Sequence, residues 1–262
     1  MSGFWIVGCG KMAGAMVAGW RRAGVLGEDV LAVRPSGTPV EGTRVVTAIP
    51  ASGEPDLVLL GVKPQVLDGI VDELEPRVGP RTTLLSILAG AELASLRRRF
   101  PRAATIVRAM PNLPVAVGEG VTALIGERAI GDAMRARFDA LGRVHLARDE
   151  AEFAAVGGLA GSGPAYVARF VEALARAGAG RGLDPDDAIA LALQTVLGTA
   201  KLAAATGEPM AALAARVASP KGTTLAGLAV LDEDGALDRL LASTTAAAES
   251  CSLELVATAR CL

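Results

Sequence analysis

The sequence predicts an α/β protein with two domains, in which a parallel sheet covered by helices on both faces precedes an all-helical part. Short β-rich runs alternate with helical spacing in the first half, and a glycine-rich turn joins the first run to a helix. From about Asp149 the strand signals stop, and the remaining apolar patterns all have helical spacing. We therefore expect one domain over residues 1–148 and a second over residues 149–262.

Apolar runs bounded by Gly, Pro or Asp are expected to form the strands of the first domain. Between them, Met12–Ala23 and Gln65–Glu75 have the spacing of amphipathic helices, the second burying its apolar positions from Val66 to Leu74. This alternation is typical of a parallel sheet. The expected strands are Phe4–Val7, Val30–Val33, Leu57–Val62, Thr83–Ile87 and Thr105–Met110.

The second domain is expected to consist of short alanine-rich helices with wide apolar stripes. One helix has a strong start signal, with Asp184 as the N-cap, Pro185 in the first turn and Asp187 reaching back in a capping box. The stripes present more apolar surface than one helical domain can cover, which indicates burial against a second subunit. Their residues include Ile189, Leu193, Val196, Leu197 and Ala200, then Met210, Leu213, Ala214 and Val217, and then Leu225, Leu228 and Leu231.

The turn after the first strand has the pattern G-x-G-x-x-A and leads directly into a helix. Gly8 permits the tight turn, Gly10 lets backbone N–H groups approach a pyrophosphate, and Ala13 keeps the helix close to the strand. The helix N-terminus favours the bound anion. In this context the motif predicts a Rossmann-like, dinucleotide-binding domain.

The second strand indicates which dinucleotide is bound. An NAD site usually ends this strand with an acidic residue, whereas here Arg34 and Ser36 follow it. A guanidinium and a hydroxyl suit a 2′-phosphate, so NADPH is favoured and NADH is the weaker alternative. Lys63 follows a later strand at the same edge, where it would meet ribose or phosphate. Both Arg34 and Lys63 have the alternative of being ordinary solvated charges.

Several functional classes are disfavoured by the composition. Lys and Arg number 26 against 28 Asp and Glu, so no overall basic field exists to attract nucleic acid. The single histidine, His145, is expected in an edge strand around Val144–Leu146 with a structural role. One histidine, no cysteine pair and no carboxylate cluster at ligand spacing support neither a metal site nor a Ser-His-Asp hydrolase.

A membrane partner and a secreted location are also not expected. The longest run without a charge, residues 153–168, contains glycines, a serine and a proline, whereas a membrane span needs about 20 mostly apolar residues. The first residues enter a strand without a preceding basic region, so we expect no signal peptide. Cys9, Cys251 and Cys261 leave an odd thiol, which suits a reducing compartment, and a cytoplasmic location is expected.

Three further motifs make the whole set recognisable. R-A-M-P-N-L-P runs from Arg108 to Pro114, A-G-S-G-P-A-Y from Ala160 to Tyr166, and S-P-K-G-T-T from Ser219 to Thr224. Together with G-C-G-K-M and V-K-P, they resemble the pyrroline-5-carboxylate reductase family, in order and over nearly the whole chain.

The resemblance implies an activity and an architecture. NADPH would deliver hydride to the C=N carbon of a cyclic imino acid, 1-pyrroline-5-carboxylate, to give L-proline in the last step of proline biosynthesis. The fold would be a Rossmann-like domain followed by an all-helical dimerisation domain that interlocks with a second subunit. The active site would lie between the nucleotide domain and helical elements at the dimer interface. The expected assembly is a homodimer, with a decamer of dimers as the larger form.

The resemblance also assigns site residues. The cofactor residues are Gly8, Cys9, Gly10, Lys11, Met12, Arg34, Ser36, Val62, Lys63, Pro64, Met110, Pro111 and Asn112. The substrate residues are Ser219, Lys221, Gly222, Thr223 and Thr224, with Thr224 as the catalytic residue that hydrogen-bonds the ring nitrogen.

The S-P-K-G-T-T segment fits a substrate that carries a carboxylate. A helix N-terminus offers unpaired N–H donors to an anion, and Thr223 or Thr224 would cap the helix 225–231 or turn its hydroxyl to the substrate. A hydroxyl is a poor proton source at neutral pH, so a protonated iminium or water is expected to supply the proton. The alternative is that the segment is only a capped turn.

Three features depart from the family pattern, and only Lys221 supports a different substrate. Lys221 stands where glycine is commonest, Lys11 replaces a frequent asparagine and is compatible with phosphate, and the segment Pro35–Glu54 is short and rich in Gly and Pro, so the helix expected after the second strand is reduced or absent. Lys221 would strengthen binding of the carboxylate, widen the range of substrates or face solvent. The alternatives are a reductase of another cyclic imine and a non-catalytic paralogue that binds a dinucleotide.

Overall fold

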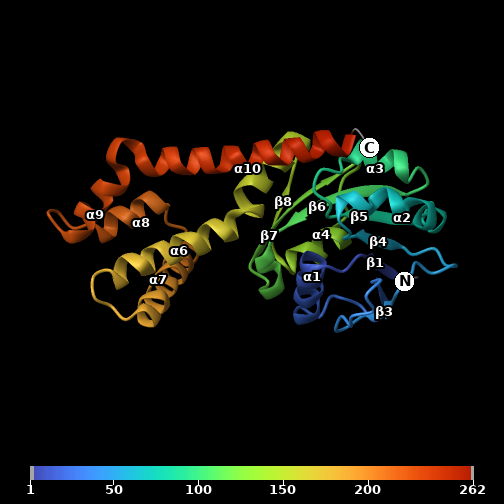
Figure 1. Ribbon diagram of the computed structural model, residues 1–262, viewed down its shortest axis with the longest axis horizontal. Coiled ribbons are helices and arrows are strands. Elements are labelled where there is room, and N and C mark those ends of the chain that lie inside the picture. Colours follow the sequence, from blue (N-terminus) through green and yellow to red (C-terminus); the bar gives the residue numbers. More distant parts are fainter. Residues whose placement is uncertain (1–2, 261–262) are drawn as a thin grey trace. The chain divides into compact units, whose positions relative to one another are not determined.

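The computed structural model describes residues 3–260 of the chain (Figure 1). It divides into two compact units. The first contains the residues up to Pro164 together with those from Ala247 onward, and the second contains Ala165–Ala246. The expected domain boundary after residue 148 coincides with the start of helix α5 (Glu150–Val156), and the compact units divide further along the chain.

The first unit contains an eight-stranded sheet in the order β3-β2-β1-β4-β5-β6-β7-β8. All pairs from β3 to β6 are parallel, as predicted. β7 is antiparallel to β6, and β8 is parallel to β7, so an all-parallel sheet was the wrong prediction for the last two strands. The strands are β1 Phe4–Val7, β2 Val30–Val33, β3 Arg44–Val46, β4 Leu57–Leu60, β5 Thr83–Ser86, β6 Thr105–Pro111, β7 Gly120–Gly126 and β8 Gly142–Leu146.

The expected strands occur, and two more were not predicted. β1 and β2 have the predicted bounds, because both faces of each are buried and their apolar runs are continuous. β3 is too short to give a pattern. β7, a run rich in β-branched residues between two glycines, was not predicted. The edge position predicted around His145 is confirmed, since β8 ends the sheet, and the segment between β2 and β4 holds β3 and no helix, also as expected.

Helices cover both faces of this sheet (Figure 1). On one face α1 and α4 bury Met16, Trp20 and Phe138 against β1, and the rings of Phe4 and Trp20 lie 5.8 Å apart, edge to face. On the other face α2 and α3 pack on β1, β4 and β5. Val66 was predicted to be buried but is 48% exposed, because it lies in a 3₁₀ turn ahead of α2. The helices are α1 Lys11–Arg22, α2 Leu67–Leu74, α3 Leu93–Arg99 and α4 Asp132–Asp139.

The second unit is entirely helical in its regular structure, as predicted. Asp184 caps α7, and its Oδ1 accepts hydrogen bonds from the N–H groups of Asp186 and Asp187 at 2.9 and 3.3 Å. The side chain of Asp187 makes no return bond among the described residues, so the predicted capping box is only half formed. The helices are α6 Gly163–Ala179, α7 Pro185–Thr206, α8 Met210–Val217, α9 Thr223–Asp232 and α10 Ala236–Arg260, the last of which continues into the first unit.

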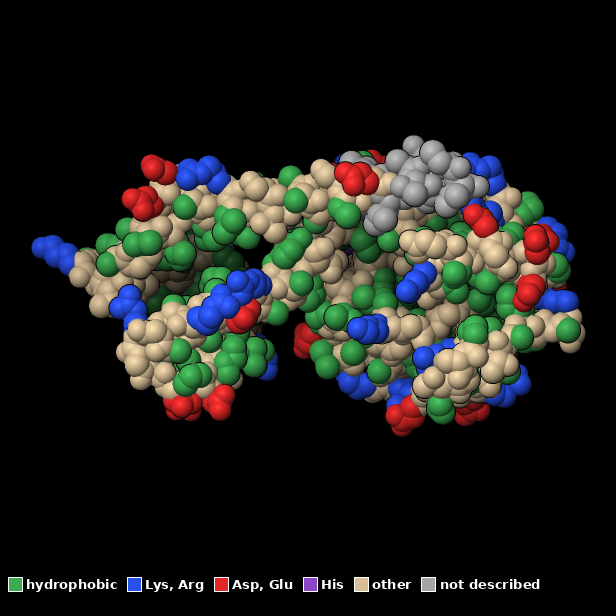
Figure 2. All heavy atoms as spheres, viewed as in Figure 1, with side chains coloured by type: hydrophobic (Ala, Val, Ile, Leu, Met, Phe, Trp, Pro, Cys, Tyr) green, Lys and Arg blue, Asp and Glu red, His purple; other side chains and the backbone are tan. Residues whose placement is uncertain are grey.

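The predicted excess of apolar surface in this unit is confirmed. Its core cluster is the small set Val171, Ala175, Ala188 and Ala192, and Leu213 of α8 is buried apart from that cluster. The stripe predicted on α7 stays largely uncovered, with Leu193 57% exposed, and Figure 2 shows hydrophobic side chains at the surface of these helices. Among the described residues, α7 is the one helix long and apolar enough to cross a membrane, and 11% of its apolar window is buried.

Candidate active site

The predicted cofactor residues lie at the carboxyl ends of the parallel strands or, for Lys11 and Met12, in the first turn of α1. Gly8 has a φ of 82°, in the left-handed region that favours glycine. A Cβ on Gly8 would lie 2.6 Å from Val62 Cγ1 and 2.7 Å from Val62 N, so only glycine fits against the end of β4. The Gly8 N–H donates to Val33 O at 3.0 Å. Three strand ends therefore meet at this glycine.

The N-terminus of α1 opens beside this turn. Gly10 is its N-cap, and no side chain accepts from the first turn among the described residues. A Cβ on Gly10 would meet no heavy atom within 4 Å, so the space in front of the helix is open. The first N–H groups of a helix lack acceptors within it. A pyrophosphate fits this end of the helix because it supplies those acceptors and complements the dipole. Lys11 is exposed and Met12 is half-buried.

The end of β2 forms a polar turn next to the glycine-rich loop. Arg34 Nη1 donates to Thr38 O at 2.9 Å, and Ser36 Oγ lies 2.8 Å from Thr38 Oγ1. Burial raises the pKa of the Cys9 thiol, and the nearby Arg34 guanidinium partly opposes that shift. Arg34 therefore lies within electrostatic reach of the loop. Cys9 is 5% exposed, so it can offer the cofactor its backbone but hardly its sulfur.

The loop after β4 is built by Lys63 and Pro64. Lys63 is the N-cap of the 3₁₀ turn Pro64–Val66, and its carbonyl accepts from Val66 N at 3.0 Å. Its side chain is exposed, whereas Val62 is half-buried against Gly8. The loop therefore presents one cation beside the dinucleotide edge.

Asn112, which follows β6, has a strong structural role. It is 5% exposed, and its Oδ1 accepts from Val121 N at 2.9 Å. Its Nδ2 donates to Ala160 O, also at 2.9 Å, in the π-helical turn Gly157–Gly161. Pro111 is buried as well, whereas Met110 is half-buried and lines a cavity. The segment thus contributes Met110 to the site and uses Asn112 to tie β6, β7 and the π-helical turn together.

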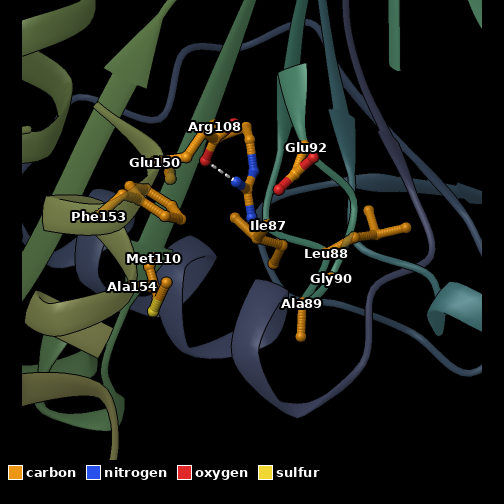
Figure 3. Close-up of a pocket in the computed structure, with 11 residues that line it drawn as sticks. Ile87, Leu88, Ala89, Gly90, Glu92, Arg108, Met110, Glu150, Phe153 and Ala154 are labelled. Carbon is orange, nitrogen blue, oxygen red and sulfur yellow. Dashed lines mark hydrogen bonds and ion pairs between the residues drawn. The ribbon is translucent and has the colours of Figure 1, made fainter. Parts of the chain in front are cut away.

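That cavity has a volume of about 130 Å³ and lies where β5 and β6 end (Figure 3). Its walls are the loop Ile87–Gly90 after β5, Met110 from β6, and Phe153 from α5. Charged groups on it are Arg108, Glu92 and Glu150. Since the phosphate end of the dinucleotide fits at β1, a cofactor extended along the sheet edge would bring its other end towards this cavity.

Sequence reasoning missed Arg108 and Glu150 as parts of the site. Arg108 Nη1 donates to Glu150 Oε2, and the guanidinium stacks on the Phe153 ring at 4.4 Å from its centroid. Desolvation by burial lowers the pKa of Arg108, and the Glu150 carboxylate opposes this. An arginine inside the otherwise apolar strand Thr105–Met110 was the available signal. Glu150 gave none, because an acidic residue in the first turn of a helix is common.

The S-P-K-G-T-T segment in the second unit forms the start of α9. Gly222 N donates to Ser219 O at 2.9 Å, and a Cβ on Gly222 would collide with Ser219 Oγ. Gly222 is the N-cap, so of the two alternatives for Thr223 and Thr224 the capping role is not found, and a hydroxyl turned to the substrate remains. Both threonines lie inside the first turn, and no side chain caps it among the described residues.

Lys221 adopts a φ of 60°, a left-handed conformation that costs a residue with a side chain about 1 kcal/mol. Its side chain is exposed. This backbone conformation gives a physical reason why glycine would suit the position. The N–H donors of the first turn of α9 have no side-chain cap among the described residues.

Comparison with known proteins agrees with these features. The model of the pyrroline-5-carboxylate reductase dimerisation family matches residues 150–255, and that of the coenzyme F420-dependent NADP oxidoreductases matches residues 4–90. A pyrroline-5-carboxylate reductase of Glycine max is 35% identical over 255 residues, which cover 93% of this chain and 92% of the relative. The chain belongs to the pyrroline-5-carboxylate reductase family.

Two further members of the family support this assignment. A pyrroline-5-carboxylate reductase of Synechocystis sp. is 43% identical over 201 residues, covering 75% of this chain and 74% of the relative. The solved structure of a pyrroline-5-carboxylate reductase from Coxiella burnetii superimposes with a TM-score of 0.85 at 28% identity, covering 97% of this chain and 98% of that one. The family fold, a Rossmann-like domain followed by a helical dimerisation domain, is thus present.

Proposed function

We propose that the chain reduces 1-pyrroline-5-carboxylate to L-proline with NADPH, the last step of proline biosynthesis. The observation that carries the proposal is the 35% identity to a named reductase over 93% of the chain. The open N-terminus of α1 and the cavity at the β5 and β6 ends lie along one sheet edge, which is the arrangement an extended dinucleotide requires. NADPH would supply the hydride.

We assign the cofactor residues by their place on this edge. The backbone from Gly8 to Met12 binds the pyrophosphate, while Arg34 and Ser36 bind the 2′-phosphate, because a guanidinium and a hydroxyl form charge-assisted hydrogen bonds with it. The loop Val62–Pro64 lies under the ribose. Met110 forms a wall for the nicotinamide, and Pro111 and Asn112 hold Met110 in place through β7 and the π-helical turn.

We assign the substrate to the start of α9. The N–H donors of its first turn bind the carboxylate, with Ser219 and Gly222 shaping the loop and the Lys221 ammonium adding positive charge. Thr224 donates or accepts a hydrogen bond at the ring nitrogen, and Thr223 lies next to it in the same turn. The residues thus bind and orient the imine, and positioning supplies most of the rate enhancement.

Arg34→Ala is expected to raise the KM for NADPH by about 10- to 100-fold, since a charged hydrogen bond contributes about 1.5–3 kcal/mol. The KM for NADH should change by less than about 2-fold, because NADH lacks the phosphate that Arg34 binds. Steady-state kinetics with both cofactors measure this. Arg81→Ala is the matched control, because Arg81 pairs with Glu54 at the amino end of β5 and should change neither KM. Equal effects of Arg34→Ala on both cofactors would contradict the assignment.

The function itself is tested by cofactor oxidation at about 340 nm with 1-pyrroline-5-carboxylate, comparing NADPH with NADH. Rapid turnover that prefers NADPH is the expected result. Turnover only with a larger or uncharged cyclic imine would favour a reductase of another substrate, with Lys221→Gly as the variant to examine next. NADPH binding without turnover on any cyclic imine would favour a non-catalytic paralogue.

We propose that a second copy of the chain covers the apolar stripe of α7, because α7 lies within the stretch matched by the dimerisation model. This would account for the length and hydropathy of α7 without a membrane. The assembly would be a homodimer, with a decamer of dimers as the larger form. Light scattering after gel filtration distinguishes these from a monomer.

We also infer separate roles for the two domains and a cytoplasmic location. Residues 1–148 would bind NADP(H), and residues 149–262 would dimerise and bind the substrate. Cys9 and Cys251 are free thiols, which suits a reducing compartment, while Cys261 lies outside the described residues. Among the described residues no group of three or more His, Cys, Asp or Glu could hold a metal ion.

A further inference from the structure

Three residues on one face of the β6 segment contact α5 and the π-helical turn in a continuous row, which we call the seam. Arg108, Met110 and Asn112 alternate along the chain and therefore point to the same side. Arg108 pairs with Glu150, Met110 Sδ fills the space where Gly157 lacks a side chain, and Asn112 donates to Ala160 O. A side chain on Gly157 would collide with that sulfur. The position of Met110 is therefore fixed by its neighbours on either side.

Glu150 extends this seam to a third element. Glu150 Oε2 accepts a hydrogen bond from Arg108. Glu150 Oε1 accepts a second one, at 3.0 Å, from the N–H of Leu93, which is the first residue of α3. α3 follows the loop Ile87–Gly90 that forms one wall of the cavity. One carboxylate thus joins β6, the start of α5 and the start of α3, and all three surround the same cavity (Figure 3).

The Arg108–Glu150 ion pair is expected to add little to the free energy of unfolding, because burying its charges costs desolvation energy. Arg108 is 5% exposed, and its buried Nε has no hydrogen-bond partner among the residues that the structure describes. Replacing a buried ion pair with apolar residues of similar size is often neutral or stabilising. Glu92 also faces the guanidinium and partly compensates its charge. A stability role alone therefore does not explain why a charged pair stands in the wall of this cavity.

We propose that Arg108 and Glu150 are positioning residues of the reductase, which hold Met110 and the loop Ile87–Gly90 at the spacing that the nicotinamide ring requires. The proposal rests on the proposed function, since it assigns the cavity to the reactive end of NADPH. Neither residue would touch the reacting atoms. They act through Met110 and through the start of α3.

The chain offers a matched control pair. Arg97 of α3 pairs with Glu127, and Glu127 Oε2 also accepts from Ile106 N at 3.1 Å near the start of β6. This second pair likewise ties α3 to β6, but away from the carboxyl edge. The test compares the double variant Arg108→Met/Glu150→Gln with the double variant Arg97→Met/Glu127→Gln. Methionine keeps the contact with Phe153, and both variants remove a complete pair rather than leave a buried charge.

We expect Arg108→Met/Glu150→Gln to lower kcat by about 10- to 100-fold, because a small misplacement of reacting groups has effects of this size. Its Kd for NADPH should stay within about 3-fold of wild type, since the pyrophosphate and 2′-phosphate contacts remain. The primary deuterium isotope effect from NADPD should increase. Arg97→Met/Glu127→Gln should keep kcat within about 2-fold of wild type. This should hold even if its melting temperature falls as much as that of Arg108→Met/Glu150→Gln.

Two measurements keep the test independent of folding and of the substrate. Arg108→Lys retains the charge but loses the planar stack on Phe153, so its kcat should lie between wild type and the double variant. The fluorescence of bound NADPH reports the surroundings of the nicotinamide without any turnover, and it should change in Arg108→Met/Glu150→Gln but not in the control.

If wild type bound NADPH but did not reduce 1-pyrroline-5-carboxylate, the proposed function would fail while this comparison would still test the positioning role. Wild-type kcat and fluorescence in Arg108→Met/Glu150→Gln, or equal losses of kcat in both double variants, would overturn the inference.

Discussion

Gly8→Ala is expected to lower the free energy of unfolding of the first unit by about 3 kcal/mol, the sum of a left-handed alanine and an overpacked contact. The φ of 82° disfavours any side chain, and the new Cβ would lie 2.6 Å from Val62 Cγ1 and 2.7 Å from Val62 N. Relief requires the backbone of β4 to move away from β1. Urea unfolding followed by far-UV circular dichroism measures the loss, and NADPH binding should weaken with it.

Two other glycines of the same segment separate folding from binding. Gly14→Ala places its Cβ in open space within α1 and should be neutral or stabilise by up to about 1 kcal/mol, as expected for an alanine in a helix. Gly10→Ala also meets no atom of the protein, so it should fold normally while binding NADPH more weakly. Equal stability of the Gly8 and Gly14 variants would contradict the account of the turn.

Thr224→Ala is expected to lower kcat on 1-pyrroline-5-carboxylate by about 10- to 100-fold, the usual effect of losing a hydrogen-bonding group at the reacting atoms. The Kd for NADPH should change little, because every residue assigned to the cofactor lies at the sheet edge. The melting temperature should also change little, since Thr224 does not cap α9. Stopped-flow reduction and fluorescence titration measure the two effects separately.

The controls for this variant use the same chemistry. Thr224→Ser keeps the hydroxyl and should recover most of the turnover. Thr199→Ala removes a hydroxyl that donates to Thr195 O within α7 in the described part of the chain, and it should leave kcat unchanged. If Thr224→Ala turned over at the wild-type rate, Thr224 would have no part in the mechanism.

Much of the nucleotide edge could be predicted because its signals are local. A strand buried on both faces shows a continuous apolar run, so β1 and β2 were predicted to the residue, and the turn at Gly8 requires a backbone that glycine favours. Helix caps are less certain, because several small residues compete. Gly222 is the cap of α9, where a threonine cap was one of two alternatives, and the loop brings Ser219 against this glycine.

Features that depend on distant partners could not be predicted from the sequence. Nothing near Glu150 indicates that it meets an arginine 42 residues earlier, or the N-terminus of α3 57 residues earlier. The reversal of β7 depends on the short 3₁₀ segment Leu113–Val117, which joins it to β6 as a hairpin rather than through a crossover helix.

The core of the helical unit has a consequence for how the protein tolerates dilution. Three of the four residues in its core cluster are alanines, which bury little area each, while large side chains of α7 such as Leu193 point outward. A single copy therefore gains little from folding this unit alone. Its folding and its association should be one reaction, so that the melting temperature rises with the logarithm of protein concentration and a diluted sample loses its helical unit before its sheet.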